Sequence, residues 1–311
     1  MLNDRREIPG QIHARLKVFL VCGRLLSFTQ AADALHVTTG AVSQQIRQLE
    51  EWLGFRLFRR LPRSLALTEE GRRLLPVVEA SYGAVDLEIH RLDGGHLSGI
   101  VRLRAVPSFL TKWLVPRLPD FQRRYPQIEL RIEAEDSAQA LLPGLFDLAI
   151  DLNDGVYPGF EISLMMEEDI FPVCAPALLE RGPSLTEPAD LRHFPLLHDM
   201  TAWRGSQPYA EWEQYLRQIG AADVDVRRGY MFNRNHLTIG AAIAGMGVAI
   251  ARRALTTDEL ASGVLVEPFN RRVSTGKRYG IVYPSGALDD RRIRAVHDWL
   301  LHQAQPPAAP L

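Results

Sequence analysis

A chain of 311 residues has room for two or three domains, each large enough to bury its own core. Its hydrophobic fraction of 46% and charged fraction of 23% are ordinary for a globular protein, and no apolar run reaches the roughly 18 residues of a transmembrane helix. Two cysteines without a CxxC pair argue against a disulfide framework and a zinc site, and the polar N-terminus lacks a signal-peptide core. We therefore expect a cytoplasmic protein with no membrane contact, no metal and no cofactor.

Charge is distributed unevenly, although the net charge is only −1. The first 73 residues contain 12 Lys+Arg and 7 Asp+Glu, a net charge of +5, whereas the remaining residues contain 24 and 30, a net charge of −6. A cationic N-terminal part on an acidic body is typical of a protein in which one domain binds nucleic acid.

Three helices are expected before Gly54, the first of them over residues 12–24. Ser27 or Thr29 can cap the second helix. Its inner face would carry Ala31, Ala34 and Leu35. The third helix would start at a cap and bury an apolar residue every three or four positions. The last two helices then form a helix-turn-helix unit, whose second helix can enter a DNA major groove.

The outward face of that third helix would carry short polar side chains and one arginine, which suit base edges and nearby phosphates. We expect the DNA contacts to come from Thr38, Thr39, Gly40, Ser43, Gln44 and Arg47. An ordinary helical hairpin with a solvated polar face is the alternative, because the motif alone is weak.

A β-hairpin wing is predicted directly after the helices. Residues 55–58 and 64–68 alternate in polarity as strands do, and the turn between them contains Arg59, Arg60 and Arg63. A cationic tip of this kind can contact phosphates or a minor groove, although a cationic surface loop with no partner would look the same.

A long helix is predicted from about Thr68 to Leu92, with Pro76 in its first turns. Apolar side chains recur along it at three- and four-residue steps: Leu75, Val78, Tyr82, Val85, Ile89 and Leu92. This seam either packs on the protein's own body or pairs two copies of the chain, and we favour pairing.

The rest of the chain reads as an α/β body that follows a glycine-rich hinge at residues 94–99. Strands expected at 100–106, 128–134 and 146–152 alternate with helices, as in a parallel sheet covered by helices. A second unit would start near Phe171 and include a strand at 224–228.

Two helix starts in this body can receive a ligand, because ligands of α/β sheets bind where strands end and helices begin. Pro107-Ser108-Phe109 follows the first strand, and Asn233 and Asn235 precede a helix of the second unit. Free backbone N–H groups there would favour an anion. The alternative is that Ser108 and Asn235 only cap their helices.

The sequence contains no convincing motif for a catalytic, metal or nucleotide-phosphate site. The GxG at 245–247 follows a helix instead of opening one, the histidine pairs lack the spacing of a helical metal site, and there is neither a GxSxG nor a P-loop. We therefore expect no enzyme activity.

The stretch LSFTQAADALHVTTGAVSQQIRQLEEWLGFRLFRRLPRSLALTEEGRRLL resembles the N-terminal winged helix-turn-helix of LysR-type transcriptional regulators. The later text RAVPSFLTKWLVPRLPDFQRRYPQIELRI and AAIAGMGVAIA is most similar to the branch of that family that includes the glycine-cleavage activator and the β-lactamase regulators.

The resemblance implies a multi-domain fold: an all-α winged helix-turn-helix head at 1–68, a linker and dimerisation helix at 69–93, the hinge, and an α/β effector-binding body at 100–311. That body would be periplasmic-binding-protein-like, with lobe I at about 100–170 and 273–304 and lobe II at about 171–272. Matching cleft positions of the family add Asp136, Asp199, Trp203 and Tyr279 to the effector-binding candidates.

The function that follows from the resemblance is regulation of transcription in the bacterial cytoplasm. A homodimer or homotetramer would bind a two-fold double-stranded DNA operator under the control of a small anionic or amino-acid-like effector, with RNA polymerase as a possible further partner. The alternative is a solute-binding or sensory module whose DNA head no longer works. Its one support is Gly40, where the family more often has a small polar residue or proline.

Overall fold

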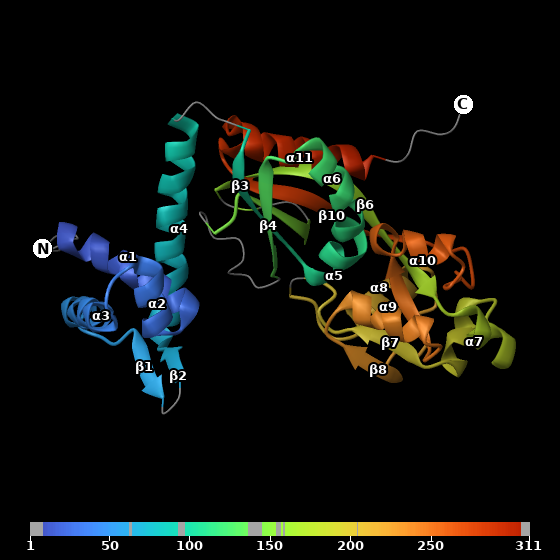
Figure 1. The fold of residues 1–311 in the computed structure, drawn as a ribbon. Helices are drawn as coiled ribbons and strands as arrows, with labels where there is room; N and C mark the ends of the chain where they lie inside the picture. The colour runs from blue at the N-terminus through green and yellow to red at the C-terminus, as the bar shows by residue number, and fades with distance from the viewer. Residues whose placement is uncertain are drawn as a thin grey trace, which may run out of the picture. The chain divides into compact units, whose positions relative to one another are not determined.

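The computed structural model describes residues 9–61, 64–92, 97–135, 145–153, 157, 159–203 and 205–305. They divide into two compact units, one up to Leu92 and one made of most of the residues after it (Figure 1). No helix in these ranges combines the length and the apolar character that crossing a bilayer requires.

The first unit, the head, is mostly helical and is built as expected. Its elements are α1 (Gly10–Leu25), α2 (Phe28–Leu35), α3 (Thr39–Leu53), β1 (Phe58–Leu61), β2 (Ser64–Leu67) and α4 (Glu69–Leu92). The Ser27 hydroxyl accepts a hydrogen bond from the Gln30 N–H and caps α2, and the Thr38 hydroxyl accepts one from the Ala41 N–H and caps α3. Gly54 ends α3 in the left-handed conformation, with φ of +83°.

The core of the head forms where α1, α2 and α3 meet. Phe19 of α1 is fully buried in it, and so are Val42 and Leu49 of α3, as the apolar spacing of α3 predicts. One expectation was wrong: Ala34 is exposed, and α2 buries Ala31 and Ala32 instead.

A dense joint connects the wing to α4. The antiparallel strands β1 and β2 pair Phe58 with Leu67. Thr68, just beyond them, donates its hydroxyl to the Arg56 carbonyl (2.7 Å) and its N–H to the Leu57 carbonyl (2.9 Å), while its hydroxyl oxygen accepts from the Gly71 N–H (3.0 Å). A Cβ at Gly71 would lie 2.3 Å from the Leu57 carbonyl oxygen, so only glycine lets the two backbones approach this closely.

The second unit contains one mixed sheet. Its first part has β3 (Gly99–Ala105), α5 (Pro107–Phe109), the π-helical η1 (Leu110–Leu114), η2 (Val115–Arg117), α6 (Leu118–Arg124), β4 (Ile128–Ala134), β5 (Leu148–Asn153) and β6 (Phe160–Val173). Its middle part has α7 (Pro176–Arg181), η4 (Pro188–His193), β7 (Leu196–Asp199), α8 (Ala210–Gln218), β8 (Gly229–Phe232), α9 (Asn235–Ile243) and β9 (Val248–Arg252). Its last part has η5 (Arg253–Leu255), α10 (Thr257–Ala261), β10 (Val273–Pro284), η6 (Ala287–Asp289) and α11 (Arg291–Ala304).

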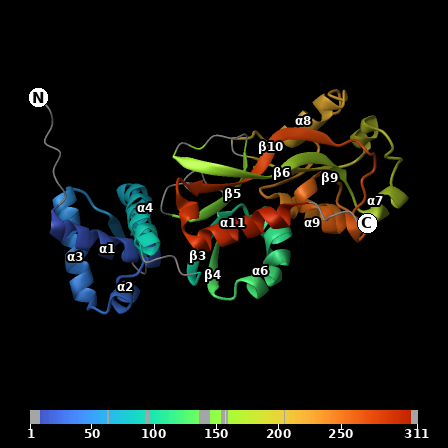
Figure 2. The ribbon, with the colours of Figure 1, turned by 90° about the horizontal axis from the view of Figure 1, so that it is seen from above.

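The strand order, among the described residues, is β4-β3-β5-β10-β6-β9-β7-β8. β3 pairs in parallel with β4 and β5, and β7 pairs in parallel with β8 and β9. The long strands β6 and β10 are antiparallel to each other and lie side by side in the centre (Figure 2). The three strands expected to form a parallel sheet are β3, β4 and β5, which do pair in parallel, and β6 and β10 add an antiparallel pair at the centre. The strand expected at 224–228 is β8, at Gly229–Phe232.

β6 and β10 divide the sheet into two lobes. Lobe I is the part with β3, β4, β5 and α11, and lobe II is the part with β7, β8, β9 and the helices α8 to α10. Lobe II has a core on each face of its strands, one around Trp212 and Tyr215 and one around Phe171 and Ile239.

Candidate functional site

The outward face of α3 carries most of the side chains expected to contact DNA. Thr39, Gly40, Gln44 and Arg47 are exposed, and Ser43 is half-buried. Thr38 is also exposed, but its hydroxyl oxygen already accepts the capping bond from the Ala41 N–H at 3.2 Å. The face is thus polar and open, with one cationic side chain.

Glu50 anchors the wing to α3, a role that the sequence did not reveal. The side chain is 7% exposed, and its Oε1 accepts the backbone N–H groups of Leu57 (2.8 Å) and Phe58 (3.1 Å). Its Oε2 accepts from Arg56 Nη1 at 2.8 Å. In the sequence Glu50 looks like any polar residue of a solvated helix.

Of the three arginines expected at the tip of the wing, the structure describes the side chain of Arg59. Arg59 is exposed on β1. Arg63 and the side chain of Arg60 lie outside the described residues.

The apolar seam of α4 is divided between two roles. Leu75, Val78 and Tyr82 pack against the core of the head, and the Tyr82 hydroxyl donates to the His13 carbonyl at 2.7 Å. For these three residues the structure differs from the expected dimer contact, because α4 must cover the α1 side of the head. Val85 and Ile89 are each 58% exposed, and the side chain of Leu92 lies outside the described residues.

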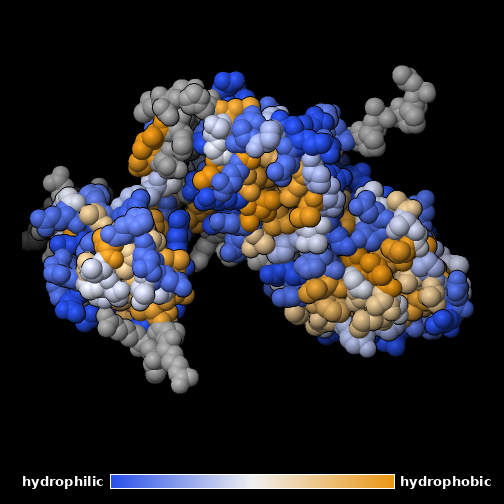
Figure 3. Space-filling model, viewed as in Figure 1, coloured by the Kyte–Doolittle hydropathy of each residue, from blue (hydrophilic) through white to orange (hydrophobic). Residues whose placement is uncertain are grey.

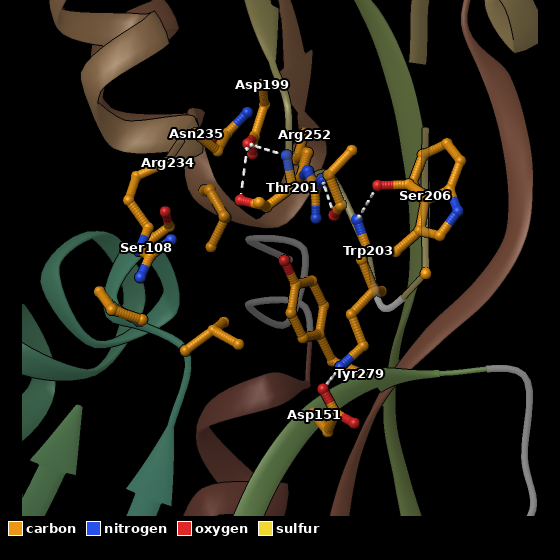
Figure 4. A pocket seen from close by; sticks show the side chains of 16 residues that line it. Ser108, Asp151, Asp199, Thr201, Trp203, Ser206, Arg234, Asn235, Arg252 and Tyr279 are labelled. Carbon is orange, nitrogen blue, oxygen red and sulfur yellow. Dashed lines mark hydrogen bonds between the residues drawn. The ribbon is translucent and has the colours of Figure 1, made fainter. Parts of the chain in front are cut away.

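A cavity of about 380 Å³ lies between the two lobes of the second unit (Figure 4). Five of the expected effector contacts line it: Ser108, Asp199, Trp203, Asn235 and Tyr279. The lining also includes Asp151, Thr201, Ser206, Arg234 and Arg252, which the sequence reasoning missed. The cavity therefore lies where β3 leads into α5 and where α9 begins, as the strand-end rule predicts.

Two expected effector residues, Phe109 and Asn233, do not line the pocket. Phe109 is fully buried and packs on the Trp113 and Tyr279 rings at 4.9 and 5.0 Å, so it supports the pocket wall from behind. Asn233 is exposed and does not line the pocket, and its carbonyl accepts from the Thr201 hydroxyl at 2.7 Å. Asp136 lies outside the described residues.

The polar groups of the pocket are held in fixed positions. Asp199 Oδ1 accepts from the Thr201 N–H at 2.9 Å and from the Thr201 hydroxyl at 3.2 Å. The Asn235 amide nitrogen donates to the Ile250 carbonyl at 3.4 Å. The Ser206 hydroxyl accepts from the Trp203 N–H at 3.3 Å. Figure 4 shows Asp199 and Asn235 close together, with the Tyr279 hydroxyl directed toward the middle of the cavity.

A buried ion pair lies behind this wall. Arg252 donates Nε and Nη2 to Glu211 Oε1 at 3.1 and 2.7 Å, and it also donates Nη2 to the Ala202 carbonyl. Burial raises the pKa of Glu211 to about 7, against the opposing effect of Arg252. Burial also raises the pKa of Glu168, a fully buried neighbour on β6, to about 7.

Two contacts join the lobes beside the pocket. The Ser108 hydroxyl of lobe I is 3.1 Å from His236 Nδ1 of lobe II and accepts from the His236 N–H at 3.3 Å. Burial, with help from nearby Lys112 and Arg234, lowers the pKa of His236 and so favours its neutral ring. Lys112 forms a 2.5 Å ion pair with Glu259 of α10.

In the ranges that the structure describes, no group of three or more His, Cys, Asp or Glu side chains is arranged to hold a metal ion. The buried cysteines Cys22 and Cys174 have pKa values raised by burial, to about 12 and about 11, which disfavours the reactive thiolate.

Comparison with known proteins gives two family matches that together cover most of the chain. Residues 13–72 match the bacterial regulatory helix-turn-helix protein of the lysR family, and residues 94–305 match the LysR substrate binding domain. The glycine cleavage system transcriptional activator of Escherichia coli (strain K12) is 36% identical over 289 residues, which is 93% of this chain and 92% of that protein.

Solved structures agree with this picture. The effector domain of the transcriptional regulator AmpR of Pseudomonas aeruginosa superimposes with a TM-score of 0.55 at 30% identity, covering 66% of this chain and 95% of that one. ArgP from Mycobacterium tuberculosis shares the fold over 94% of this chain and 96% of its own, with a TM-score of 0.65 at 20% identity.

Proposed function

The chain belongs to the LysR family of bacterial transcriptional regulators, and on this premise we propose that the pocket between its lobes binds a small anionic or amino-acid-like effector that controls DNA binding by the head. The observation that carries this proposal is that both acidic and cationic side chains line the pocket, into which α9 begins. We also propose domain limits of 1–68 for the head, 69–93 for the linker helix, 94–99 for the hinge and 100–311 for the effector domain. The family matches at 13–72 and 94–305 support these limits.

For DNA recognition we propose that Gln44 and Ser43 read bases, that Arg47 contacts a base or phosphate, and that Arg59 and its neighbours in the wing bind backbone phosphates. The exposed polar face of α3 supports this assignment. The alternative, a head that has lost DNA binding, receives no support. A side chain at Gly40 would find only the Thr38 hydroxyl, 3.9 Å away, so glycine there leaves the shape of the helix surface intact.

The test is fluorescence anisotropy of the full-length protein on the DNA upstream of its own gene, against unrelated DNA, across a salt series. We expect selective binding that weakens steeply with salt, because phosphate contacts release counterions. Arg47→Ala should weaken specific binding by about tenfold or more. Arg227→Ala, which removes an exposed arginine from lobe II, is the control and should bind as the parent does. Equal binding by all three proteins would refute the assignment of Arg47.

For assembly we propose a homodimer or homotetramer on a two-fold operator. Val85 and Ile89 expose apolar surface on α4, and orange side chains gather around α9 of lobe II on the face in Figure 3, where Leu237 and Ile243 are 44% and 39% exposed. Ile89→Glu should shift the mass measured by light scattering toward the monomer, whereas Glu88→Gln, at an exposed neighbouring position, should not.

We further propose that the protein acts in the cytoplasm, without enzymatic activity and with RNA polymerase as a partner at the promoter. The relatives that support this are transcriptional regulators, among them an activator.

A further inference from the structure

Unpartnered hydrogen-bond acceptors line the deep side of the pocket. Asn235 is 3% exposed, and because its amide nitrogen donates to Ile250, its Oδ1 faces away from that carbonyl and has no partner among the described residues. Asp199, 5% exposed, uses only Oδ1 in its bonds with Thr201. The fully buried Tyr279 hydroxyl lies beside the Glu168 carboxyl and the Arg252 guanidinium, so the acceptors left for a ligand are those of Asn235 and Asp199. A buried acceptor without a partner is costly, so a donor from a ligand fits this place.

The charge on this side of the pocket is negative. Asp199, Glu211 and Glu168 are 5%, 4% and 0% exposed, and the one buried cation among them is Arg252, itself 5% exposed. We call these four residues the acidic cluster. Arg234 and Asp151, which also line the pocket, carry one positive and one negative charge. The acidic cluster is therefore left with an excess of carboxylates over cations.

We propose that the effector presents a primary ammonium group to the acidic cluster, held by Asp199 and by the side-chain oxygen of Asn235, and that the effector is a small amine or amino acid, not a simple carboxylate. This inference rests on the proposed function, because it names the chemistry of the same effector site. The ammonium supplies three donors and one positive charge, which are what the unpartnered acceptors and the excess of carboxylates lack.

Proton release accompanies this binding. The groups that face the Glu168 and Glu211 carboxyls are Arg252, Arg253, Asp199, Tyr279 and the Ala254 backbone, and Asp199 also faces His236. With pKa values raised by burial to about 7, these two carboxyls are partly protonated at neutral pH. An arriving cation favours their ionised forms, so affinity rises between about pH 6 and pH 8. An effector with only negative charge would instead bind more weakly as the pH rises.

The test uses the full-length protein and isothermal titration calorimetry with matched probes. One set carries an ammonium group (glycine, L-alanine, D-alanine and ethanolamine), and the other replaces the ammonium by hydroxyl (glycolate, L-lactate, D-lactate and ethylene glycol). We expect at least one ammonium-bearing probe to bind at least tenfold more tightly than its hydroxyl partner, with affinity rising from pH 6 to pH 8. Equal binding within every pair, no binding by any ammonium-bearing probe, or affinity that falls with pH would overturn the proposal.

Asp199→Asn provides the matched variant. It keeps the shape of the side chain and the oxygen that accepts the Thr201 N–H, but it removes the charge. Asp225→Asn is the control, because Asp225 accepts the Arg227 N–H with the same two-residue spacing and the same 2.9 Å distance, yet is exposed and does not line the pocket.

We expect Asp199→Asn to weaken the binding of the ammonium-bearing probe by about tenfold to hundredfold, and Asp225→Asn to leave it unchanged. Equal affinities in the two variants would overturn the proposal, and Asn235→Ala, expected to weaken the same probe, provides a second variant should Asp199→Asn fail to fold. Fluorescence anisotropy of the same protein on DNA separates the two proposals. If the protein binds no DNA, the proposed regulatory function is contradicted. If it binds DNA but does not prefer ammonium-bearing probes, only the proposed ammonium site is contradicted.

Discussion

Replacing Glu50 by alanine removes the one carboxylate that connects α3 to the first residues of the wing. The Leu57 and Phe58 N–H groups then lose their acceptor, and both residues are buried, at 0% and 7% exposure. A buried donor without a partner costs about 1–3 kcal/mol, so the pair gives about 2–6 kcal/mol. The ion pair with Arg56 adds less than about 1 kcal/mol, because the Arg56 side chain is 73% exposed and water screens it.

Glu50→Ala is therefore expected to lower the free energy of unfolding of the head by about 2–6 kcal/mol. Glu50→Gln retains one acceptor oxygen and should cost only about 1 kcal/mol. Hydrogen exchange of the Leu57 and Phe58 amides measures the local effect, and urea unfolding measures the whole. DNA affinity should fall with the wing, because β1 would no longer be fixed to α3.

Glu51→Ala is the natural control, since Glu51 is the next residue along α3 and is exposed. Its unfolding free energy should stay within about 0.5 kcal/mol of the parent, as for most surface substitutions. If Glu50→Ala behaved like Glu51→Ala, with the Leu57 and Phe58 amides still protected, the bonds to Glu50 could not be what fixes the wing.

The other predictions concern packing and buried charge. Gly71→Ala should cost about 1–3 kcal/mol in urea unfolding because its Cβ would lie 2.3 Å from a backbone carbonyl oxygen, whereas Gly40→Ala, with open space around it, should be neutral or stabilising. Arg252→Met should lower the stability measured by thermal unfolding by about 3–5 kcal/mol, because it leaves the Glu211 carboxylate unpaired. Adding Glu211→Gln should restore part of that loss. A double variant no more stable than Arg252→Met would contradict this. The pKa of Glu168 rises on folding from 4.5 to about 7, so the folded protein binds the extra proton in this window and stability should fall by about 1–3 kcal/mol as the pH rises from 5 to 8. Glu168→Gln should reduce that slope in unfolding measured across the same pH range but not abolish it, because burial also raises the pKa of Glu211 to about 7. An unchanged slope would contradict the assignment to Glu168.

The head could be predicted well from the sequence because its signals are local. Each signal can be recognised from a few neighbouring residues. They are a hydroxyl side chain before each of α2 and α3, an apolar residue every three or four positions, and a glycine at the end of α3. What the sequence did not show is the partner of each side chain. Glu50 looks solvated, and Leu75 looks free to pair with a second copy, until the chain folds back on itself.

The body was harder to predict because its central strands break the simple patterns. β6 pairs with β10 through register shifts, so its burial does not alternate evenly, and no strand was expected over most of Phe160–Val173. β8 is exposed on both faces apart from Phe232 and therefore lacks an apolar stripe. The strand was placed a few residues too early for that reason.

The pocket shows the same division between local and distant signals. Ser108 and Asn235 were identified because each lies at a helix start, which is visible along the chain. Arg252 was missed because it ends the buried strand β9, where an arginine reads as an exposed flank, and only folding brings it against Glu211, 41 residues away. Charge pairing across such distances has no signature in a single sequence.

The joint at Thr68 and Gly71 has a mechanical consequence. The Thr68 hydroxyl bonds to both the wing and α4, and Gly71 of α4 lies close to the Leu57 carbonyl. These contacts fix α4 rigidly to the wing. The 24 residues of α4 span about 36 Å at 1.5 Å per residue. If α4 tilted by only about 5° about its Leu92 end, its Glu69 end would then move by about 3 Å. That displacement is close to the roughly 3.4 Å rise of one base pair. In the proposed dimer on DNA, a small change of angle where the two copies meet would thus be enough to shift the register of α3 by about one base pair.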